Sequence, residues 1–410
     1  MRYSIYNFIL LFLTLTSVKK ATSLASEVSN QVSRRAFGTS TGTILALNSK
    51  STSNEMPNPQ YWNRETSARK QYSTTSPITQ EANIICISDP NDDANQMLYK
   101  GNLPEGAKVL AIGSQMSDFD IEKLKESKAN VIFSSHPKAR EPLGKLLQEI
   151  PSIQWVHSRS AGIDSITSKE LANSSVLLTN AKGAFSSTLA EYTMMAIAYF
   201  AKDLPRLLKQ KNDKNWEKYC IEEIRGKTLA IVGYGDIGRA TAKLAKAYGM
   251  NVKALRRNPE KSQDDSICDT VYSNDKKSLH RIMSESDYIL CAAPLTPETK
   301  GMFDKEAFAS AKKNAVFINV GRGPIVEESA LIDALKNGPL KGAALDVVAT
   351  EPLPEDSELW ELPNVLISPH NMDMTETFTQ EATEFFIEEN LPRFLRGELL
   401  LNPADKVAGY

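Results

Sequence analysis

A glycine-rich turn, placed between an apolar run and a helical pattern, constrains the fold of this chain more than any other feature. The apolar run Leu229–Val232 leads into Gly233-Tyr234-Gly235-Asp236-Ile237-Gly238, and a helical pattern follows over Arg239–Tyr248. In such a unit the first glycine allows a tight turn, the second lets the backbone approach a pyrophosphate, and the third lets helix and strand pack closely. The helix N-terminus offers free amide hydrogens and a partial positive charge to phosphate groups. The motif therefore predicts a dinucleotide site that uses Gly233, Gly235, Asp236, Ile237 and Gly238.

Short apolar runs alternate with helical patterns through most of the chain. A first series of expected buried strands comprises Ile84–Ile87, Val109–Ile112, Val131–Phe133, Ile153–Val156 and Val176–Leu178. A second series comprises Thr228–Val232, Val252–Leu255, Tyr288–Cys291, Val316–Val320, Ala343–Val347 and Val365–Ile367. Alternation of this kind predicts parallel sheets with helices on both faces. Because there are two series, we expect an α/β fold of two Rossmann-like, doubly wound domains with a cleft between them.

The strand after the glycine turn bears on which nicotinamide cofactor fits. A site for NAD places an acidic residue near the end of that strand, where it binds the ribose 2′-hydroxyl. No acidic residue occurs between Arg239 and Pro259, and the strand ends in Leu255-Arg256-Arg257. Arginine matches a 2′-phosphate in charge and geometry. The pattern favours NADP(H), with Arg256 and Arg257 as ligands. NAD(H) stays possible if both arginines are only solvated surface charges.

Composition excludes several classes of protein. With 48 Lys and Arg against 50 Asp and Glu, the net charge is -2, and no strong charge favours nucleic acid or an anionic membrane. The apolar run Phe8–Val18 is shorter than the roughly 20 residues that a membrane-spanning helix needs. The four cysteines are scattered, without metal-ligand or redox spacing. We therefore expect no metal site, no disulfide scaffold and no membrane span in the mature protein.

The first 80 residues have the composition of a targeting presequence. Before Thr79 they hold only three acidic residues, and they are rich in Ser and Thr. A short signal-like apolar region with the small-residue stretch Ser23-Leu24-Ala25 precedes a basic, transit-like segment. Together they resemble the bipartite presequence of algae with complex plastids. A mitochondrial presequence, a disordered tail and a twin-arginine signal at Arg34-Arg35 are the alternatives.

Three later segments carry polar residues directly after expected strands. They are Asn319–Pro324, Asp346–Leu353 and Ser368–Asn371. In open parallel sheets, ligands bind at the carboxyl ends of the strands. Arg322 and His370 therefore lie where chemistry is expected.

With these segments, the chain resembles the D-isomer-specific 2-hydroxyacid dehydrogenase family from about residue 84 to 400. The likeness includes Ser160-Ala161-Gly162-Ile163-Asp164, Asn180-Ala181-Lys182-Gly183 and the glycine turn. The resemblance implies a catalytic set of Arg322, Glu351 and His370. It also implies substrate binding by Arg322 and by the backbone around Ser160, Ala161, Gly162 and Ile163. Further cofactor contacts would come from Ala293, Pro294, Val320, Gly321 and Asp346.

The chemistry of 2-oxo acid reduction explains these residue types. A histidine can give a proton to the carbonyl oxygen near neutral pH, which makes His370 the general acid in reduction and the base in oxidation. A carboxylate beside it favours the imidazolium and orients the ring, which is the role of Glu351. Arg322 would bind the substrate carboxylate through a guanidinium that stays charged. His136, His157 and His280 lack such partners and are interpreted as structural.

Some positions depart from the family pattern. Met372 stands where many relatives carry a small residue, and Asp373 follows it, so the substrate pocket is expected to differ. Formate dehydrogenases carry Gln where this chain has Glu351, which argues against formate as substrate. The substrate side chain is expected to meet Lys182, Ser158, Arg159 and Met372, although the sequence does not specify the 2-oxo acid.

The resemblance also implies a domain order and a homodimer. Residues 81–184 and 374–410 would form the substrate domain, and 185–373 the dinucleotide domain, with a long helix over Ser187–Leu208 as the dimer contact. The favoured function is NADPH-dependent reduction of glyoxylate or hydroxypyruvate. Phosphoglycerate dehydrogenase-like activity and a cofactor-gated, corepressor-type interaction protein are the alternatives.

Overall fold

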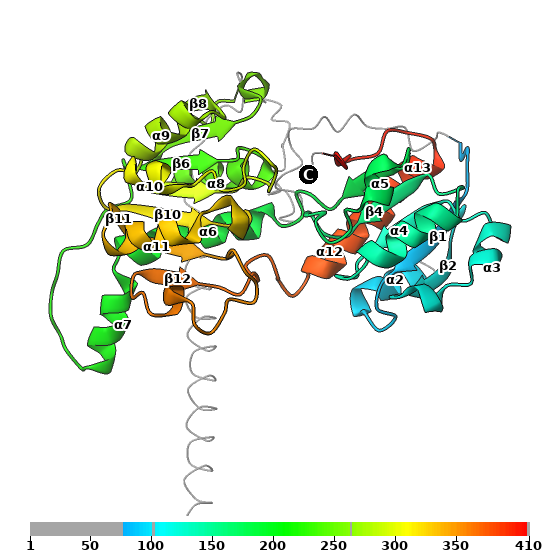
Figure 1. Ribbon diagram of the computed structural model, residues 1–410, viewed down its shortest axis with the longest axis horizontal. Helices are drawn as coiled ribbons and strands as arrows, with labels where there is room; N and C mark the ends of the chain where they lie inside the picture. The colour runs from blue at the N-terminus through cyan, green and yellow to red at the C-terminus, as the bar shows by residue number, and fades with distance from the viewer. Residues whose placement is uncertain (1–76, 101–102, 263–264, 408–410) are drawn as a thin grey trace, which may run out of the picture. The chain divides into compact units, whose positions relative to one another are not determined.

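Two parallel β-sheets organise the chain in the computed structural model, which describes residues 77–100, 103–262 and 265–407 (Figure 1). This confirms the predicted fold class of two α/β domains. The predicted presequence lies outside the described residues, apart from residues 77–80. No helix within the described ranges is long and apolar enough to cross a membrane.

The first sheet has five strands in the order β2-β1-β3-β4-β5, which is the order of flavodoxin-like doubly wound folds. Its strands are β1 (Ala82–Ile87), β2 (Ala107–Gly113), β3 (Val131–Ser134), β4 (Trp155–Ser158) and β5 (Leu177–Asn180). Its helices are α2 (Gln96–Tyr99), α3 (Ile121–Glu126), α4 (Arg140–Glu149) and α5 (Lys169–Asn173). The two faces are buried by different elements, since Ile85 packs with α3–α5 residues and Ile84 with residues near the C-terminus.

The second sheet has seven strands in the order β12-β11-β10-β9-β6-β7-β8, all paired in parallel. Its strands are β6 (Thr228–Val232), β7 (Asn251–Arg256), β8 (Thr270–Ser273), β9 (Tyr288–Cys291), β10 (Ala315–Asn319), β11 (Leu340–Leu345) and β12 (Val365–Ile367). Its helices are α6 (Ser186–Ala201), α7 (Leu204–Asn212), α8 (Asp236–Ala247), α9 (Lys276–Ser284), α10 (Lys305–Ala309) and α11 (Glu328–Lys336). The strand order reverses between β6 and β9, which is the place where doubly wound folds bind ligands.

Successive residues of β6 serve opposite faces of the second sheet. Ala230 and Val232 pack with residues of α9, α10 and α11, whereas Leu229 and Ile231 pack with residues of α6 and α8. Both faces are covered, so the strand reads as one continuous apolar run rather than as an alternating pattern.

The expected strands and helices differ from the structure at several places, for example in β11, which runs over Leu340–Leu345 instead of Ala343–Val347. Strand β8 was not expected, because its Thr-Val-Tyr-Ser sequence is short and half-exposed at the sheet edge. The expected strand Ile153–Val156 lies two residues later, as β4. The expected helix Ser187–Leu208 is two helices, broken at Asp203, which has a φ of 53° and caps α7 through the Arg206 amide. Pro205 in the first turn of α7 is the local signal for that new start.

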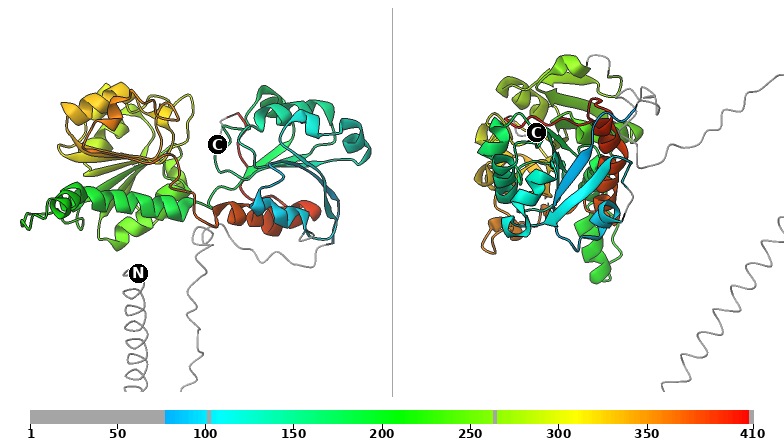
Figure 2. Two further views of the ribbon diagram at one scale, coloured as in Figure 1. Left: turned by 90° about the horizontal axis from the view of Figure 1, so that it is seen from below. Right: turned by 90° about the vertical axis from the view of Figure 1, so that its right-hand side faces the viewer.

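The C-terminal helical segment returns to the first sheet. Figure 2 shows the red C-terminal helices beside the blue elements of that sheet. They are α12 (Phe378–Glu384), a π-helical turn (Phe385–Asn390) and α13 (Leu391–Leu395). Pro392 lacks the amide hydrogen that a regular helix would use there, which accounts for the irregular turn before it. Phe386 and Phe394 of this segment pack on Trp155 of β4, with ring centroids 5.1 and 5.2 Å apart.

Candidate active site

The glycine turn lies between β6 and α8, at the carboxyl edge of the second sheet. Gly233 has a φ of 98°, and a Cβ there would lie 2.5 Å from the Ala293 amide nitrogen. A Cβ on Gly238 would lie 2.7 Å from the Gly233 carbonyl oxygen. Both positions therefore require glycine. A Cβ on Gly235 would meet no protein atom within 4 Å, so this backbone faces open space where a pyrophosphate fits.

A cavity of about 880 Å³ opens beside this turn and is lined by residues that follow strands of both sheets. Its size is within the usual range for small-molecule and cofactor sites. Of the residues predicted to catalyse the reaction or to bind the cofactor or the substrate carboxylate, all but two line it. Gly238 lies beneath the turn, and the Ile163 side chain is 1% exposed in the core of the first sheet. The structure thus brings the predicted catalytic, cofactor and substrate residues to one cavity.

One end of the cavity is basic. Arg256 and Arg257, at the end of β7, line it together with Asn258 and Lys261. The Arg256 guanidinium donates to the Ser262 hydroxyl, and Arg257 Nη2 lies 3.5 Å from Glu298 Oε2. Lys261 was missed by the sequence analysis, although it continues the basic stretch that begins at Arg256. A negatively charged group on a bound ribose would meet these cations.

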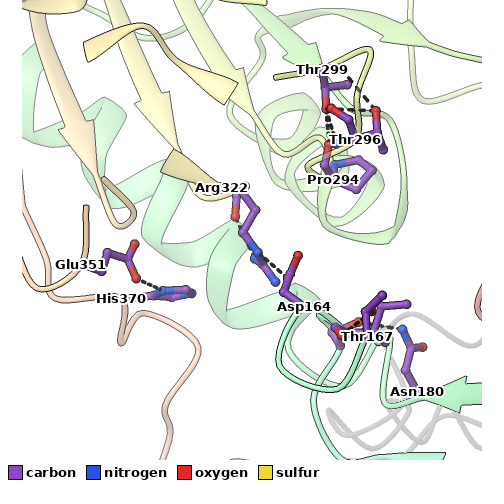
Figure 3. Close-up of polar contacts among 12 residues, drawn as sticks. Asp164, Thr167, Asn180, Pro294, Thr296, Thr299, Arg322, Glu351 and His370 are labelled. Atoms are coloured by element: carbon purple, nitrogen blue, oxygen red, sulfur yellow. Dashed lines mark hydrogen bonds and ion pairs between the residues drawn. The ribbon is translucent and has the colours of Figure 1, made fainter. Parts of the chain in front are cut away.

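His370 and Glu351 form a pair at the other end of the cavity (Figure 3). His370 Nδ1 lies 2.8 Å from Glu351 Oε2, and the other carboxylate oxygen accepts from the Val348 amide at 3.2 Å. An ionised carboxylate only accepts hydrogen bonds, so the imidazole carries a hydrogen on Nδ1. This leaves Nε2 as the ring nitrogen that can exchange a proton with a ligand.

Arg322 follows β10 and lies between the His370–Glu351 pair and Asp164 (Figure 3). Its Nε lies 3.1 Å from Asp164 Oδ2, and its Nη1 donates to the Gly321 carbonyl at 2.8 Å. The guanidinium packs on Gly162, where a Cβ would lie 1.8 Å from Nη2. Glycine at 162 is therefore what lets this loop of the first sheet meet the arginine. Asp164 was quoted in the sequence motif, but its contact with Arg322 was not predicted.

Asp346 holds the loop that carries His370. Its carboxylate is 3% exposed and accepts from the Ser368 hydroxyl at 2.7 Å and from the amides of Asn371 and Met372 at 3.2 and 3.3 Å. The Asp346 carbonyl accepts from the His370 amide at 2.9 Å. His370 has a φ of 50°, a backbone conformation that residues other than glycine rarely adopt. Surrounding contacts must therefore maintain it. Asp346 thus orients the histidine loop, a role that the sequence did not reveal; its expected contact with the cofactor stays a prediction.

The loop Ser160–Gly162 after β4 lines the cavity, and Nδ2 of the Asn180 side chain donates to the Ala161 carbonyl at 2.6 Å. Three residues expected near the substrate side chain do not line it. Ser158 is buried in β4, and Met372 packs against the core of the second sheet. Arg159 Nη1 lies 2.7 Å from Asp92 Oδ2, which draws its side chain away. Lys182 does line the cavity, 3.6 Å from Asp236.

His157 matches the structural interpretation given to it. It is fully buried in β4 among aromatic rings, and its Nδ1 lies 2.7 Å from the Thr179 hydroxyl. Burial lowers the pKa of His157 to about 3, so this side chain is neutral at neutral pH. Among the described residues, no group of three His, Cys, Asp or Glu side chains could hold a metal ion.

Comparison with known proteins matches this geometry to one family. The family model described as D-isomer specific 2-hydroxyacid dehydrogenase, NAD binding domain, matches residues 194–371. The chain is 30% identical over 311 residues to a glyoxylate reductase of Korarchaeum cryptofilum, covering 74% of this chain and 87% of that protein. It is 30% identical over 321 residues to a D-3-phosphoglycerate dehydrogenase of Methanocaldococcus jannaschii, covering 78% of this chain but only 58% of that protein.

A solved structure gives the same result. The D-isomer specific 2-hydroxyacid dehydrogenase of Xanthobacter autotrophicus Py2, crystallised with NADPH and MES, has a TM-score of 0.68 and 26% identity. The match covers 80% of this chain and 100% of that one. The matched NAD binding domain includes the glycine turn, and the NADPH complex of this relative also supports a nicotinamide cofactor for this chain. The sequence motifs, the two sheets and these matches agree that the chain belongs to the D-isomer-specific 2-hydroxyacid dehydrogenase family.

Proposed function

We propose that the protein is an NADPH-dependent reductase that converts a small 2-oxo acid, glyoxylate or hydroxypyruvate, to the 2-hydroxy acid, which is the D isomer where the product is chiral. The observation that carries this proposal is that Arg322, the His370–Glu351 pair and the glycine turn line one cavity. Reduction of a 2-oxo acid needs an anion-binding group, a proton donor and a hydride donor side by side, and this cavity offers a place for each.

The protein's own side chains bind the substrate and supply the proton. The substrate carboxylate binds Arg322, which keeps its charge at any working pH, and the backbone of the Ser160–Gly162 loop. His370 Nε2 donates the proton to the carbonyl oxygen, because Nδ1 is occupied by Glu351. Glu351 stabilises the charged imidazolium before the transfer. A nicotinamide cofactor, when bound, would supply the hydride for the carbonyl carbon.

The preference for NADPH is supported by the charges at the β7 end of the cavity. Arg256, Arg257 and Lys261 line this end, whereas the acidic residues that line the cavity lie elsewhere. A 2′-phosphate would be neutralised there, and among the described lining residues no carboxylate lies at this end to accept a hydrogen bond from a bare 2′-hydroxyl.

Steady-state kinetics of the purified full-length protein test the proposal. With glyoxylate or hydroxypyruvate, we expect kcat/KM to be about tenfold or more higher with NADPH than with NADH. Replacing Arg256 and Arg257 together by Ala should raise KM for NADPH by about tenfold or more and change KM for NADH far less. The cofactor proposal would be contradicted if the double variant kept the wild-type KM for NADPH, or if the wild type preferred NADH. Absence of turnover with every 2-oxo acid would contradict the reductase proposal.

We also propose a homodimer that uses α6 and α7. Helix α7 has no buried residue in this single chain, and Leu207 and Leu208 are 43% and 52% exposed. Exposed leucines on a helix of this kind favour coverage by a second subunit. Sedimentation should show a dimer that Leu207→Asp and Leu208→Asp together dissociate.

Import into a plastid, with the mitochondrion as alternative, is proposed on the sequence of residues 1–80 alone and is tested by locating a fluorescent fusion.

A further inference from the structure

We infer that Asp373 makes the substrate pocket selective for charge: it admits 2-oxo acids whose third carbon carries a neutral hydroxyl or is absent, and it rejects those with a second anionic group. This inference rests on the proposed function and narrows its substrate class. Asp373 follows His370 by three residues and lines the same cavity as His370, Arg322 and Phe378.

The position of Asp373 places its charge where a small substrate must lie. Its carboxyl interacts electrostatically with both His370 and Arg322, and burial raises the pKa of Asp373. A molecule of two or three carbons that is anchored to Arg322 by its carboxylate and to His370 by its carbonyl has all its atoms between these groups. A substituent on its third carbon therefore lies within the field of the Asp373 carboxylate.

The basic residues around the cavity give no second anion a partner beside His370. Arg256, Arg257 and Lys261 lie at the β7 end, and Lys182 lies next to Asp236 of the glycine turn. Arg159, which the sequence left available for a phosphate, is paired with Asp92 and does not line the cavity. Among the described lining residues, Arg322 is then the one guanidinium near His370, and the substrate carboxylate already uses it.

Acidic groups surround this end of the cavity instead. Asp164 lies 3.1 Å from Arg322, Glu351 lies 2.8 Å from His370, and Asp373 adds a third carboxyl. Glu351 and Asp164 each have a cationic or imidazole partner at hydrogen-bond or ion-pair distance. Asp373 makes no such side-chain contact to another described residue, so its carboxyl is available to a ligand. A substrate hydroxyl can donate to it, whereas a carboxylate or phosphate would be repelled.

The test compares hydroxypyruvate with oxaloacetate, which carries a second carboxylate on its third carbon, in wild type and Asp373→Asn. For the wild type we expect kcat/KM to favour hydroxypyruvate by about a hundredfold or more, and Asp373→Asn should shrink that ratio by about tenfold or more. Glu376→Gln is the matched control: it removes the same charge three residues on, from an exposed side chain that does not line the cavity. That variant should leave the ratio within about twofold of the wild-type value.

Several outcomes would overturn the inference. A wild type that reduces both acids equally well, or an Asp373→Asn variant whose ratio equals that of the wild type, shows that Asp373 does not select on charge. A uniform loss with both substrates would make Asp373 a support for His370 instead. Asp373→Ser also removes the charge and is used if the Asn variant does not fold. Binding of NADPH, followed by fluorescence, checks that the variant is folded. If the wild type reduces hydroxypyruvate and only the ratio fails to respond, the inference is wrong but the reductase proposal stands; if no 2-oxo acid is reduced, both fall.

Discussion

The carboxyl edge of the second sheet and the interior of the first sheet each hold a histidine, in opposite surroundings. His370 is 41% exposed in its side chain, lines a cavity and pairs with a carboxylate at 2.8 Å. His157 is fully buried and touches the Thr179 hydroxyl, and no carboxylate of the described residues pairs with it. The difference shows that access and an acidic partner, rather than the imidazole itself, decide whether a histidine can exchange protons with a ligand.

Replacing His370 should have the largest effect on turnover. His370→Asn removes the proton donor, so we expect kcat for 2-oxo acid reduction to fall by about a thousandfold. Binding of NADPH should persist, because the glycine turn and Arg256 belong to other loops. Stopped-flow turnover and cofactor fluorescence measure the two quantities. Turnover within tenfold of the wild type would show that His370 is not the proton donor. In that case His370 and His157 would not differ in catalytic role.

Removing the acidic partner should have the next largest effect. Glu351→Gln keeps the size of the side chain but no longer stabilises a charged imidazolium, so we expect kcat to fall by about a hundredfold. The matched control is Glu328→Gln, which changes a neighbouring carboxylate that accepts from the Ala349 amide. This variant should lower kcat far less. Equal losses in the two variants would mean that loop structure, not charge beside His370, is what Glu351 provides.

The first sheet contributes to the site through Gly162, and its replacement should have a moderate effect. Gly162→Ala puts a Cβ into the space of Arg322 Nη2, so the guanidinium must move. We expect KM for the 2-oxo acid to rise by about tenfold, with a smaller change in kcat. Gly183→Ala introduces backbone strain without a clash, because φ is 95° there and a Cβ would meet nothing within 4 Å, and it therefore separates the two effects. If both variants behave alike, Arg322 does not depend on this loop.

Replacing His157 should have the smallest effect on turnover and a clear effect on stability against pH. Its pKa is about 3 in the folded chain against 6.5 in an exposed histidine, so between these pH values the unfolded chain binds a proton that the folded chain does not. The folded state therefore loses stability as pH falls through this window, by roughly 5 kcal/mol for the full difference. His157→Gln should flatten this part of the pH dependence of the free energy of unfolding, while turnover at neutral pH stays within about twofold. If the free energy of unfolding of the variant falls with pH as steeply as that of the wild type, other groups cause the loss of stability in acid.

The fold and the main site residues were predictable because they rest on local signals. Fully buried parallel strands appear as apolar runs, and the turn at Gly233 needs glycines for contacts that the structure shows. Strand β8 carried no such signal, since an exposed edge strand has no reason to be apolar. The break at Asp203 was overlooked because the apolar spacing continues across it.

Contacts between distant segments were beyond the reach of the sequence. The placement of Asp164 against Arg322 joins residues 158 positions apart, and the pairing of Arg159 with Asp92 depends on how β4 and the loop after β1 pack. Met372 is partly buried and packs against the core of the second sheet, which no spacing rule predicts. Side-chain direction at loop positions follows from tertiary packing, and it determines which of the expected pocket residues line the cavity.

The amides of Thr79 and Gln80 both donate to the Leu395 carbonyl, at 2.9 and 3.3 Å, directly before β1. Strand β1 is interior to its sheet, between β2 and β3. Any cleavage of the polypeptide upstream of β1 would therefore have a sharp downstream limit. Cleavage before Thr79 would leave both hydrogen bonds in place. Cleavage a few residues later would remove the two amides that bind the last turn of α13 and would then shorten β1, with which β2 and β3 both pair.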